Sequence, residues 1–123
     1  MYNIRTTRIR FTIDADNTLK MMKARTGLTP NILCRLALTL SLDEPGLPRL
    51  IKDEKKSERE INRYTLMGEY DSAFVALTKT RLRQDAIGAD QAEEFFVAHI
   101  HRGISLLPNR VKALADLAGL LPE

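Results

Sequence analysis

The sequence has few of the residues from which cofactor sites and membrane segments are built. Cys34 is the only cysteine among 123 residues, so the chain forms no internal disulfide and cannot by itself hold an iron–sulfur cluster or a structural zinc. The longest apolar run, from Ile32 to Leu42, is interrupted by Arg35 and is shorter than the roughly 20 residues that cross a bilayer. The first five residues lack the pattern of a signal peptide. We therefore expect a cytoplasmic protein that carries no cofactor and does not enter a membrane.

Motifs typical of enzymes are missing as well. The sequence contains no phosphate-binding glycine loop, Gly-x-Ser-x-Gly turn or zinc-ligand spacing. His99 and His101 would point about 200° apart on a helix and cannot share a metal ion, so we expect one buried and one solvent-facing histidine. Cys34 is predicted to be buried and inert. Tyr64 and Tyr70 could attack a phosphodiester, but no acidic cluster or histidine pairing accompanies them. The sequence therefore predicts a protein that is not an enzyme.

The charge of the chain is unevenly distributed. Residues 1–35 contain seven Lys and Arg residues against two Asp residues, a net charge of +5, whereas the whole chain carries +3, so the other 88 residues carry −2. Clustered cations favour nucleic acid because neutralising phosphates releases condensed counterions. A solvated basic face explains the same charge about as well. Charge alone therefore leaves DNA binding open.

The N-terminal third has the pattern of a strand followed by two helices. Residues 6–13 alternate between polar and apolar side chains, as in a strand with one buried face. The alternation predicts that Ile9, Phe11 and Ile13 point inward and that Thr6, Arg8, Arg10 and Thr12 point outward. A helix is then expected from about residue 15 to residue 25, capped by Asp14 or Asp16. Gly27 and the Thr29-Pro30 pair predict a tight turn and a second helix over Ile32 to Leu42.

This order of elements is that of a ribbon-helix-helix unit. One strand is not stable alone, so two chains would pair their strands antiparallel and bury their apolar second helices against each other. The paired ribbon would fit the major groove, with Arg8 and Arg10 at phosphates or guanine edges and Lys20 and Lys23 at the backbone. The alternative is an edge strand whose arginines only keep it soluble. The residues predicted to bind DNA are Arg5, Arg8, Arg10, Lys20, Lys23 and Arg25.

The chain as a whole predicts a mainly α protein in three parts. Residues 1–44 form the ribbon-helix-helix-like unit for DNA binding and oligomerisation, residues 45–60 a charged loop or linker, and residues 61–123 a helical half packed on the first. The linker begins at the Pro45–Pro48 break and includes the mixed-charge run Lys52 to Glu60. Residues 61–67 are compatible with either helix or strand. Helices are predicted over Asp71 to Gln84, Asp90 to Arg102 and Pro108 to Ala118.

Three segments together resemble the DndE family of the bacterial DNA phosphorothioation system. They are Arg8-Ile-Arg-Phe-Thr12 with the Gly27 turn, Asn62-Arg-Tyr-Thr-Leu-Met-Gly-Glu-Tyr-Asp71, and His99-Ile-His-Arg-Gly103. The resemblance covers nearly the whole chain, and the second and third segments are its more specific parts.

The resemblance implies that the chain takes part in replacing a non-bridging phosphate oxygen of DNA by sulfur. It places the sulfur chemistry in partner proteins: a cysteine desulfurase, an iron–sulfur protein and an ATPase. It also implies a homo-oligomer, a tetramer, that binds nicked double-stranded DNA through surface lysines. The choice of Lys20 and Lys23 among the lysines comes from their spacing and charge.

Several alternatives remain open at this point. A ribbon-helix-helix protein makes groove contacts and prefers a sequence, whereas binding to nicked DNA requires phosphate contacts and a preference for a structure. If a tetramer packs its strands inward, Arg8 and Arg10 would leave the DNA surface and the lysines would dominate. The other functions considered are a ribbon-helix-helix transcriptional repressor or antitoxin, an assembly scaffold without a nucleic-acid role, and a nickase acting through Tyr64 or Tyr70.

Overall fold

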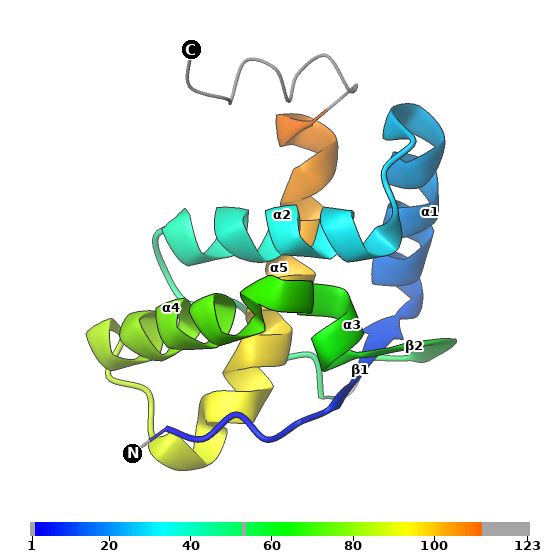
Figure 1. Cartoon of the computed structure of the whole chain (residues 1–123). Coiled ribbons are helices and arrows are strands. Elements are labelled where there is room, and N and C mark those ends of the chain that lie inside the picture. The colour runs from blue at the N-terminus through cyan, green and yellow to red at the C-terminus, as the bar shows by residue number, and fades with distance from the viewer. Residues whose placement is uncertain (1, 53, 112–123) are drawn as a thin grey trace.

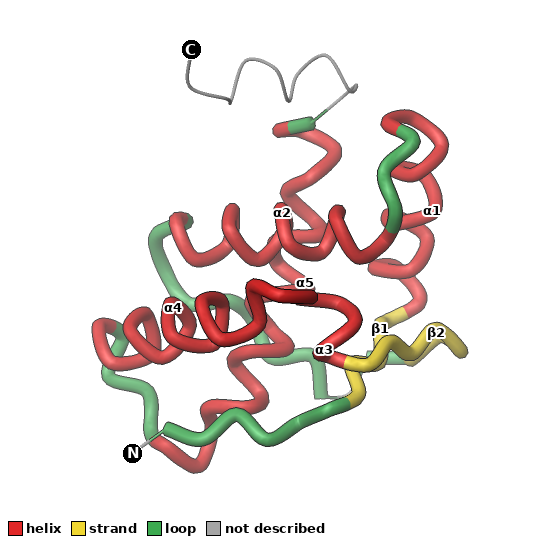
Figure 2. Tube along the Cα trace, viewed as in Figure 1, coloured by secondary structure: helices red, strands yellow, loops and turns green. Residues whose placement is uncertain are grey.

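The computed structural model describes residues 2–52 and 54–111. These residues form five α-helices and one small sheet, joined by loops (Figures 1 and 2). The elements in chain order are β1 (Arg8–Thr12), α1 (Ile13–Thr26), α2 (Pro30–Asp43), β2 (Lys56–Asn62), α3 (Arg63–Met67), η1 (Gly68–Tyr70), α4 (Asp71–Gln84), η2 (Ala89–Gln91) and α5 (Ala92–Arg110). The elements η1 and η2 are single 3-10 turns that lead into α4 and α5. The prediction of a mainly helical protein is confirmed.

The sheet differs from the prediction because β1 finds its partner within the same chain. β1 pairs antiparallel with β2, and the Cα partners include Arg8 with Asn62 and Arg10 with Glu60. The sequence predicted a loop or linker over Lys52 to Glu60 and a second chain as the partner of β1. β1 thus has a strand partner on one edge without a second chain, so the ribbon-helix-helix arrangement is not confirmed.

The alternation of residues 6–13 holds only as far as Phe11. A register shift lies between Arg10 and Thr12, and α1 begins at Ile13. Thr12 is consequently buried, at 6% exposure, while Ile13 is 38% exposed, the reverse of the prediction for both. The side chain of Thr12 accepts a hydrogen bond from the Ala15 backbone N–H at 3.1 Å. Thr12 therefore caps α1, and neither of the two aspartates proposed for that role does so.

The turn between α1 and α2 is as predicted. Gly27 ends α1 in the left-handed conformation, with a φ of 76°, and its N–H donates to the Lys23 carbonyl. Thr29 caps α2 through its side chain, and Pro30 occupies the first turn, where its missing N–H costs nothing. Local chemistry is sufficient to specify this turn, because each of its residues acts on its own neighbours.

Helix α2 crosses α5, and their backbones approach closely at Gly103. A Cβ added to Gly103 would lie 1.8 Å from the carbonyl oxygen of Ala37, so the crossing requires glycine. Leu33 and Leu38 of α2 are fully buried in the core on this side. Ile32, on another side of α2, is 40% exposed. The predicted packing of α2 against a second subunit stays a prediction for that exposed side.

The second half of the chain is mainly helical, as predicted, although the helix that was predicted to end at Arg102 continues to Arg110. α4 has the predicted limits, and residues 61–67 are divided between the end of β2 and α3. α5 runs on through Pro108 to Arg110, so Pro108 does not begin a new helix. Residues 112–118 of that predicted helix lie outside the described residues. The core joins side chains from Ile4 to Val111, and the predicted boundaries between the three parts stay a prediction.

Candidate nucleic-acid interface

All six side chains predicted to bind DNA lie on the surface. Arg8 and Arg10 belong to the exposed face of β1, and the side chain of Arg8 is 79% exposed. Lys20, whose side chain is 63% exposed, lies on α1. In Figure 1, α1 continues directly from the end of β1 on the side of the molecule away from α4. The exposed members of this basic surface are Arg5, Arg8, Arg10, Lys20, Lys23 and Arg25.

The contacts that these cations make are weak ones. Arg8 lies 3.6 Å from the Glu60 carboxylate across the ribbon, and Arg10 donates a hydrogen bond of 3.2 Å to the Ser57 carbonyl. Lys20 lies 3.5 Å from the Asp16 carboxylate, one helical turn away on α1. The Arg8–Glu60 pair is exposed on both sides, and such pairs contribute only about 0 to 1 kcal/mol. The basic surface can therefore exchange its present partners for phosphates at little cost.

Asp16 fixes the ribbon to α1. Its carboxylate accepts a hydrogen bond from the Nε of Arg59 on β2 and is largely buried. Burial raises the pKa of Asp16, but the hydrogen bond and charge of Arg59, together with Lys20, outweigh burial and hold this pKa below its usual value. Asp16 therefore remains a carboxylate. It positions the strand beside the helix that carries Lys20.

Four other arginines are held by the fold. Arg63 is 5% exposed and its Nη1 donates to the carbonyls of Ile4 and Thr6 at 2.7 and 3.0 Å. The same guanidinium binds both carboxylate oxygens of Asp71, at 3.0 and 3.3 Å. On the other side of α3, the Nε of Arg35 donates to the Leu66 carbonyl at 2.7 Å. Arg63 is thus enclosed by the fold, and Arg35 is partly buried with its Nε bound to a carbonyl.

The remaining two held arginines cap the C-terminal end of α2. Arg81 of α4 donates through Nη1 to the Leu42 and Glu44 carbonyls, at 2.9 and 2.7 Å. Arg102 of α5 donates through Nε to the Ser41 hydroxyl at 2.9 Å and through Nη2 to the Ser41 carbonyl at 2.7 Å. α2 has no basic residue in its own last turn. The two guanidinium groups thus satisfy carbonyls that the helix itself leaves free.

Both histidines are buried, which corrects the expectation that one faces solvent. His99 Nδ1 lies 2.8 Å from the Ser41 hydroxyl oxygen. Burial, together with the charges of Arg102 and Arg81, lowers the pKa of His99 to about 4. His101 is only 8% exposed, and its Nε2 accepts the backbone N–H of Thr12 at 3.2 Å. Burial also lowers the pKa of His101, so both rings are neutral at pH 7.

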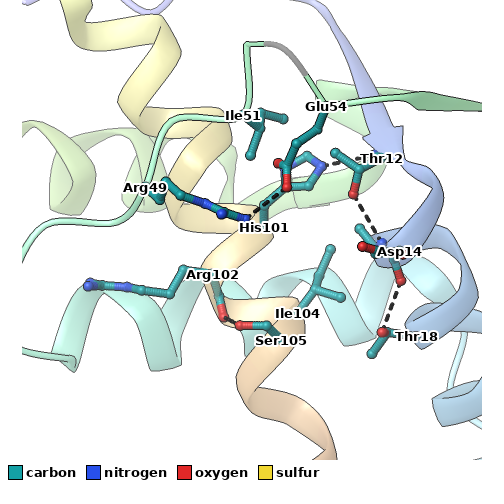
Figure 3. Close-up of a pocket in the computed structure, with 11 residues that line it drawn as sticks. Thr12, Asp14, Thr18, Arg49, Ile51, Glu54, His101, Arg102, Ile104 and Ser105 are labelled. Carbon is teal, nitrogen blue, oxygen red and sulfur yellow. Dashed lines mark hydrogen bonds and ion pairs between the residues drawn. The ribbon is translucent and has the colours of Figure 1, made fainter.

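A cavity of about 330 Å³ lies between the start of α1 and α5 (Figure 3). Arg49 and Glu54 form an ion pair of 2.8 Å at its edge, and Asp14 and His101 also line it. The histidine ring has partners at both nitrogens. Within the described residues, no group of three His, Cys, Asp or Glu side chains could hold a metal ion. The hydroxyls of Thr12, Thr18 and Ser105, which also line the cavity, bond to backbone groups.

Two further sequence predictions concern single reactive groups. Cys34 is buried, which confirms that part of the prediction, and burial raises the pKa of its thiol to about 12. Tyr64 and Tyr70 are each 54% exposed.

Among the helices of the described residues, none combines the length and hydropathy that crossing a membrane requires.

Comparison with known proteins gives a family and a fold. The family model of the DNA sulphur modification protein DndE matches residues 8–114. The crystal structure of DndE from Escherichia coli B7A, described as involved in DNA phosphorothioation modification, superposes with a TM-score of 0.67 at 24% identity, over 87% of this chain and 98% of that one. A DndE mutant involved in DNA phosphorothioation gives a TM-score of 0.64 at 24% identity, over 85% and 98% of the two chains. No match was found among curated proteins.

Proposed function

This chain belongs to the DndE family of DNA sulphur modification proteins, and we propose that it serves the phosphorothioation machinery as a non-enzymatic subunit that binds nicked double-stranded DNA. The observation that carries this proposal is the division of its cations. Those of β1 and α1 are exposed and weakly paired, while four other arginines are held by the fold. Exposed clustered cations are what phosphate binding requires.

Partner proteins supply the sulfur chemistry in this proposal. A sulfur carrier needs an accessible thiolate, whereas the only cysteine, Cys34, is buried and its pKa is raised to about 12. A cysteine desulfurase, an iron–sulfur protein and an ATPase would perform the transfer. This chain would deliver the DNA, as a tetramer that presents several copies of the basic surface.

The internal pairing of β1 favours this function over that of a ribbon-helix-helix repressor or antitoxin. Such a protein builds its DNA-reading ribbon from one strand of each of two chains. In this chain, β1 pairs with β2. The acidic Glu60 lies directly opposite Arg10 on that ribbon, and a carboxylate on the outer face opposes a close approach to the groove. Phosphate contacts through Lys20 and Lys23 fit the surface better.

A binding comparison on one DNA sequence tests the proposal. The double variant Lys20→Ala, Lys23→Ala should bind nicked duplex on the order of 10-fold more weakly at low salt, with the log–log salt slope reduced by about two, because two phosphate contacts are lost. Fluorescence anisotropy measures both quantities. A matched control is Lys79→Ala, Arg83→Ala, which removes the same charge from α4.

The two variants separate a specific surface from general electrostatic attraction. The α4 control should retain wild-type affinity, and thermal unfolding should show that both proteins remain folded. If the α1 variant binds as tightly as the wild type, the basic surface is not the DNA-binding surface. If both variants weaken binding equally, only net charge matters and the proposed site is wrong.

A further inference from the structure

An exposed aromatic ring lies at the end of the basic ribbon. β2 ends at Asn62, which pairs with Arg8 across the sheet. The Asn62 side-chain oxygen accepts the backbone N–H groups of Tyr64 at 2.9 Å and Thr65 at 3.4 Å, and so begins α3. Tyr64 therefore follows, by two residues, the position opposite Arg8. Figure 1 shows α3 beginning directly at the end of the sheet.

The ring of Tyr64 is held on one side and open on the other. The guanidinium carbon of Arg63 lies over the ring, 4.6 Å from its centroid. Arg63 cannot move with the ring, because Asp71 and two backbone carbonyls fix it. More than half of the Tyr64 side chain nevertheless faces solvent. This contact restricts one face of the ring, and a restricted ring loses less freedom on binding a flat partner.

Bases in an intact duplex offer no free face to such a ring, because each base pair is stacked between two neighbours. A strand break relieves this constraint, since the duplex can open there and expose the face of a base. Aromatic side chains bind exposed bases by stacking, with little dependence on sequence. Lysine and arginine contacts to phosphates do not read the bases. A ring that stacks on an exposed base would therefore add a preference for the break to the binding that the cations provide.

Building on the DNA-binding function proposed above, we infer that Tyr64 stacks on the base exposed at a strand break and gives this protein its preference for nicked over intact DNA. Tyr70 is equally exposed but does not suit this role. It lies in η1 between Glu69 and Asp71, and Glu69 is exposed. A carboxylate beside the ring repels the phosphates that flank a base, whereas neither neighbour of Tyr64 in sequence, Arg63 or Thr65, is acidic.

Two DNA dumbbells of one sequence, closed by loops at both ends, provide the substrates for the test. One is sealed and the other carries a single nick, so that duplex ends do not contribute. Tyr64→Ala should bind the nicked dumbbell on the order of 10-fold more weakly than the wild type and the sealed one equally well. Tyr64→Phe should keep the preference, because it keeps the ring. Tyr64→Leu retains apolar bulk without a ring and should lose the preference.

A matched control and a direct optical signal complete the experiment. Tyr70→Ala removes an equally exposed ring and should behave as the wild type. A 2-aminopurine placed at the nick should change its fluorescence on binding to the wild type and to Tyr64→Phe, but not to Tyr64→Leu. Circular dichroism checks that each variant is folded.

The outcomes separate this inference from the function on which it rests. If the wild type prefers the nicked dumbbell and Tyr64→Ala and Tyr64→Leu keep that preference, the inference about Tyr64 is overturned while the proposed function stands. The inference is also overturned if Tyr70→Ala loses the preference to the same extent, or if the wild type binds both dumbbells equally. If the wild type binds neither dumbbell at low salt, the proposed function and the inference fail together.

Discussion

The β1–α1 side of the molecule and the end of α2 use cations in opposite ways. On β1 and α1 the basic side chains are exposed, and their contacts are single and long. At the end of α2, Arg81 and Arg102 each donate several short hydrogen bonds to carbonyls. Both regions are basic by residue count. Their difference shows that residue count alone does not identify the cations that are free to bind phosphate.

This comparison has a thermodynamic consequence that experiments can test. Changes at the α2–α5 crossing should affect the free energy of unfolding and leave DNA affinity unchanged when the protein is folded. Changes on the basic surface should do the reverse. The comparison would be contradicted by a substitution at the α2–α5 crossing that changes DNA affinity, or by one on the basic surface that changes the free energy of unfolding.

Gly103→Ala should have the largest effect on stability. The new Cβ would meet the Ala37 carbonyl oxygen at 1.8 Å, so α2 and α5 must move apart. We expect a loss of about 3 kcal/mol in the free energy of unfolding, at the upper end of the usual range for overpacking, measured by urea denaturation. Ser105→Ala, at an exposed position of the same helix, serves as the control and should change it by less than about 0.5 kcal/mol. An equally small change for Gly103→Ala would contradict the close crossing.

Lowering the pH should have the second largest effect on the free energy of unfolding, through His99 of α5. The pKa of His99 is about 4 in the folded protein and about 6.5 when unfolded. Because the folded pKa is the lower one, His99 contributes full stability above pH 6.5 and progressively less as the pH falls towards 4. The expected loss from this residue is on the order of 2 kcal/mol between pH 7 and pH 5.

Urea denaturation at the two pH values measures this loss, with His99→Gln as the comparison. The variant should show a smaller dependence on pH than the wild type. Part of the dependence should remain, because the pKa of His101 is lowered as well. Equal pH dependence in the two proteins would show that His99 is not held neutral by its surroundings.

The smallest effect comes from a matched pair of arginine substitutions, one in each region. Arg102→Met should lose about 1.5 kcal/mol of unfolding free energy, because the α2 carbonyls lose a charged donor, and should bind DNA as the wild type does. Arg10→Met should change stability by less than about 0.5 kcal/mol and weaken DNA binding at low salt. Denaturation and anisotropy on both proteins test the pair. The opposite pattern would mean that the two groups of cations have been assigned the wrong roles.

Local sequence signals predicted those elements whose residues act on their own neighbours. The alternation up to Phe11, the turn at Gly27 and the limits of α4 needed no information from distant parts of the chain. β2 was missed because its residues are mostly charged and read as a loop. Its stability as a strand comes from β1 and from the contact of Arg59 with Asp16, 43 residues away in sequence. Single-sequence patterns cannot show such a partner.

The two segments most typical of the family have structural roles that their sequence alone did not show. Arg63, after the Asn62 cap, ties the N-terminal segment to Asp71. In the other segment, His101 accepts the Thr12 N–H and Arg102 caps α2. Both segments therefore build the scaffold, and the candidate site lies mainly outside them. The exposure of Arg8 and Arg10 could be inferred from the alternation of β1, but the four held arginines could not be told apart from the exposed cations.

The contact between Gly103 and Ala37 also limits how this chain can change over evolutionary time. The atom in the way of a side chain at position 103 is a main-chain oxygen, which every amino acid at position 37 possesses. A second substitution at that position cannot make room in the way that a smaller side chain relieves an ordinary core clash. Only a displacement of one whole helix would suffice, so suppressor mutations of a Gly103 change should be sought among residues that set the spacing of α2 and α5.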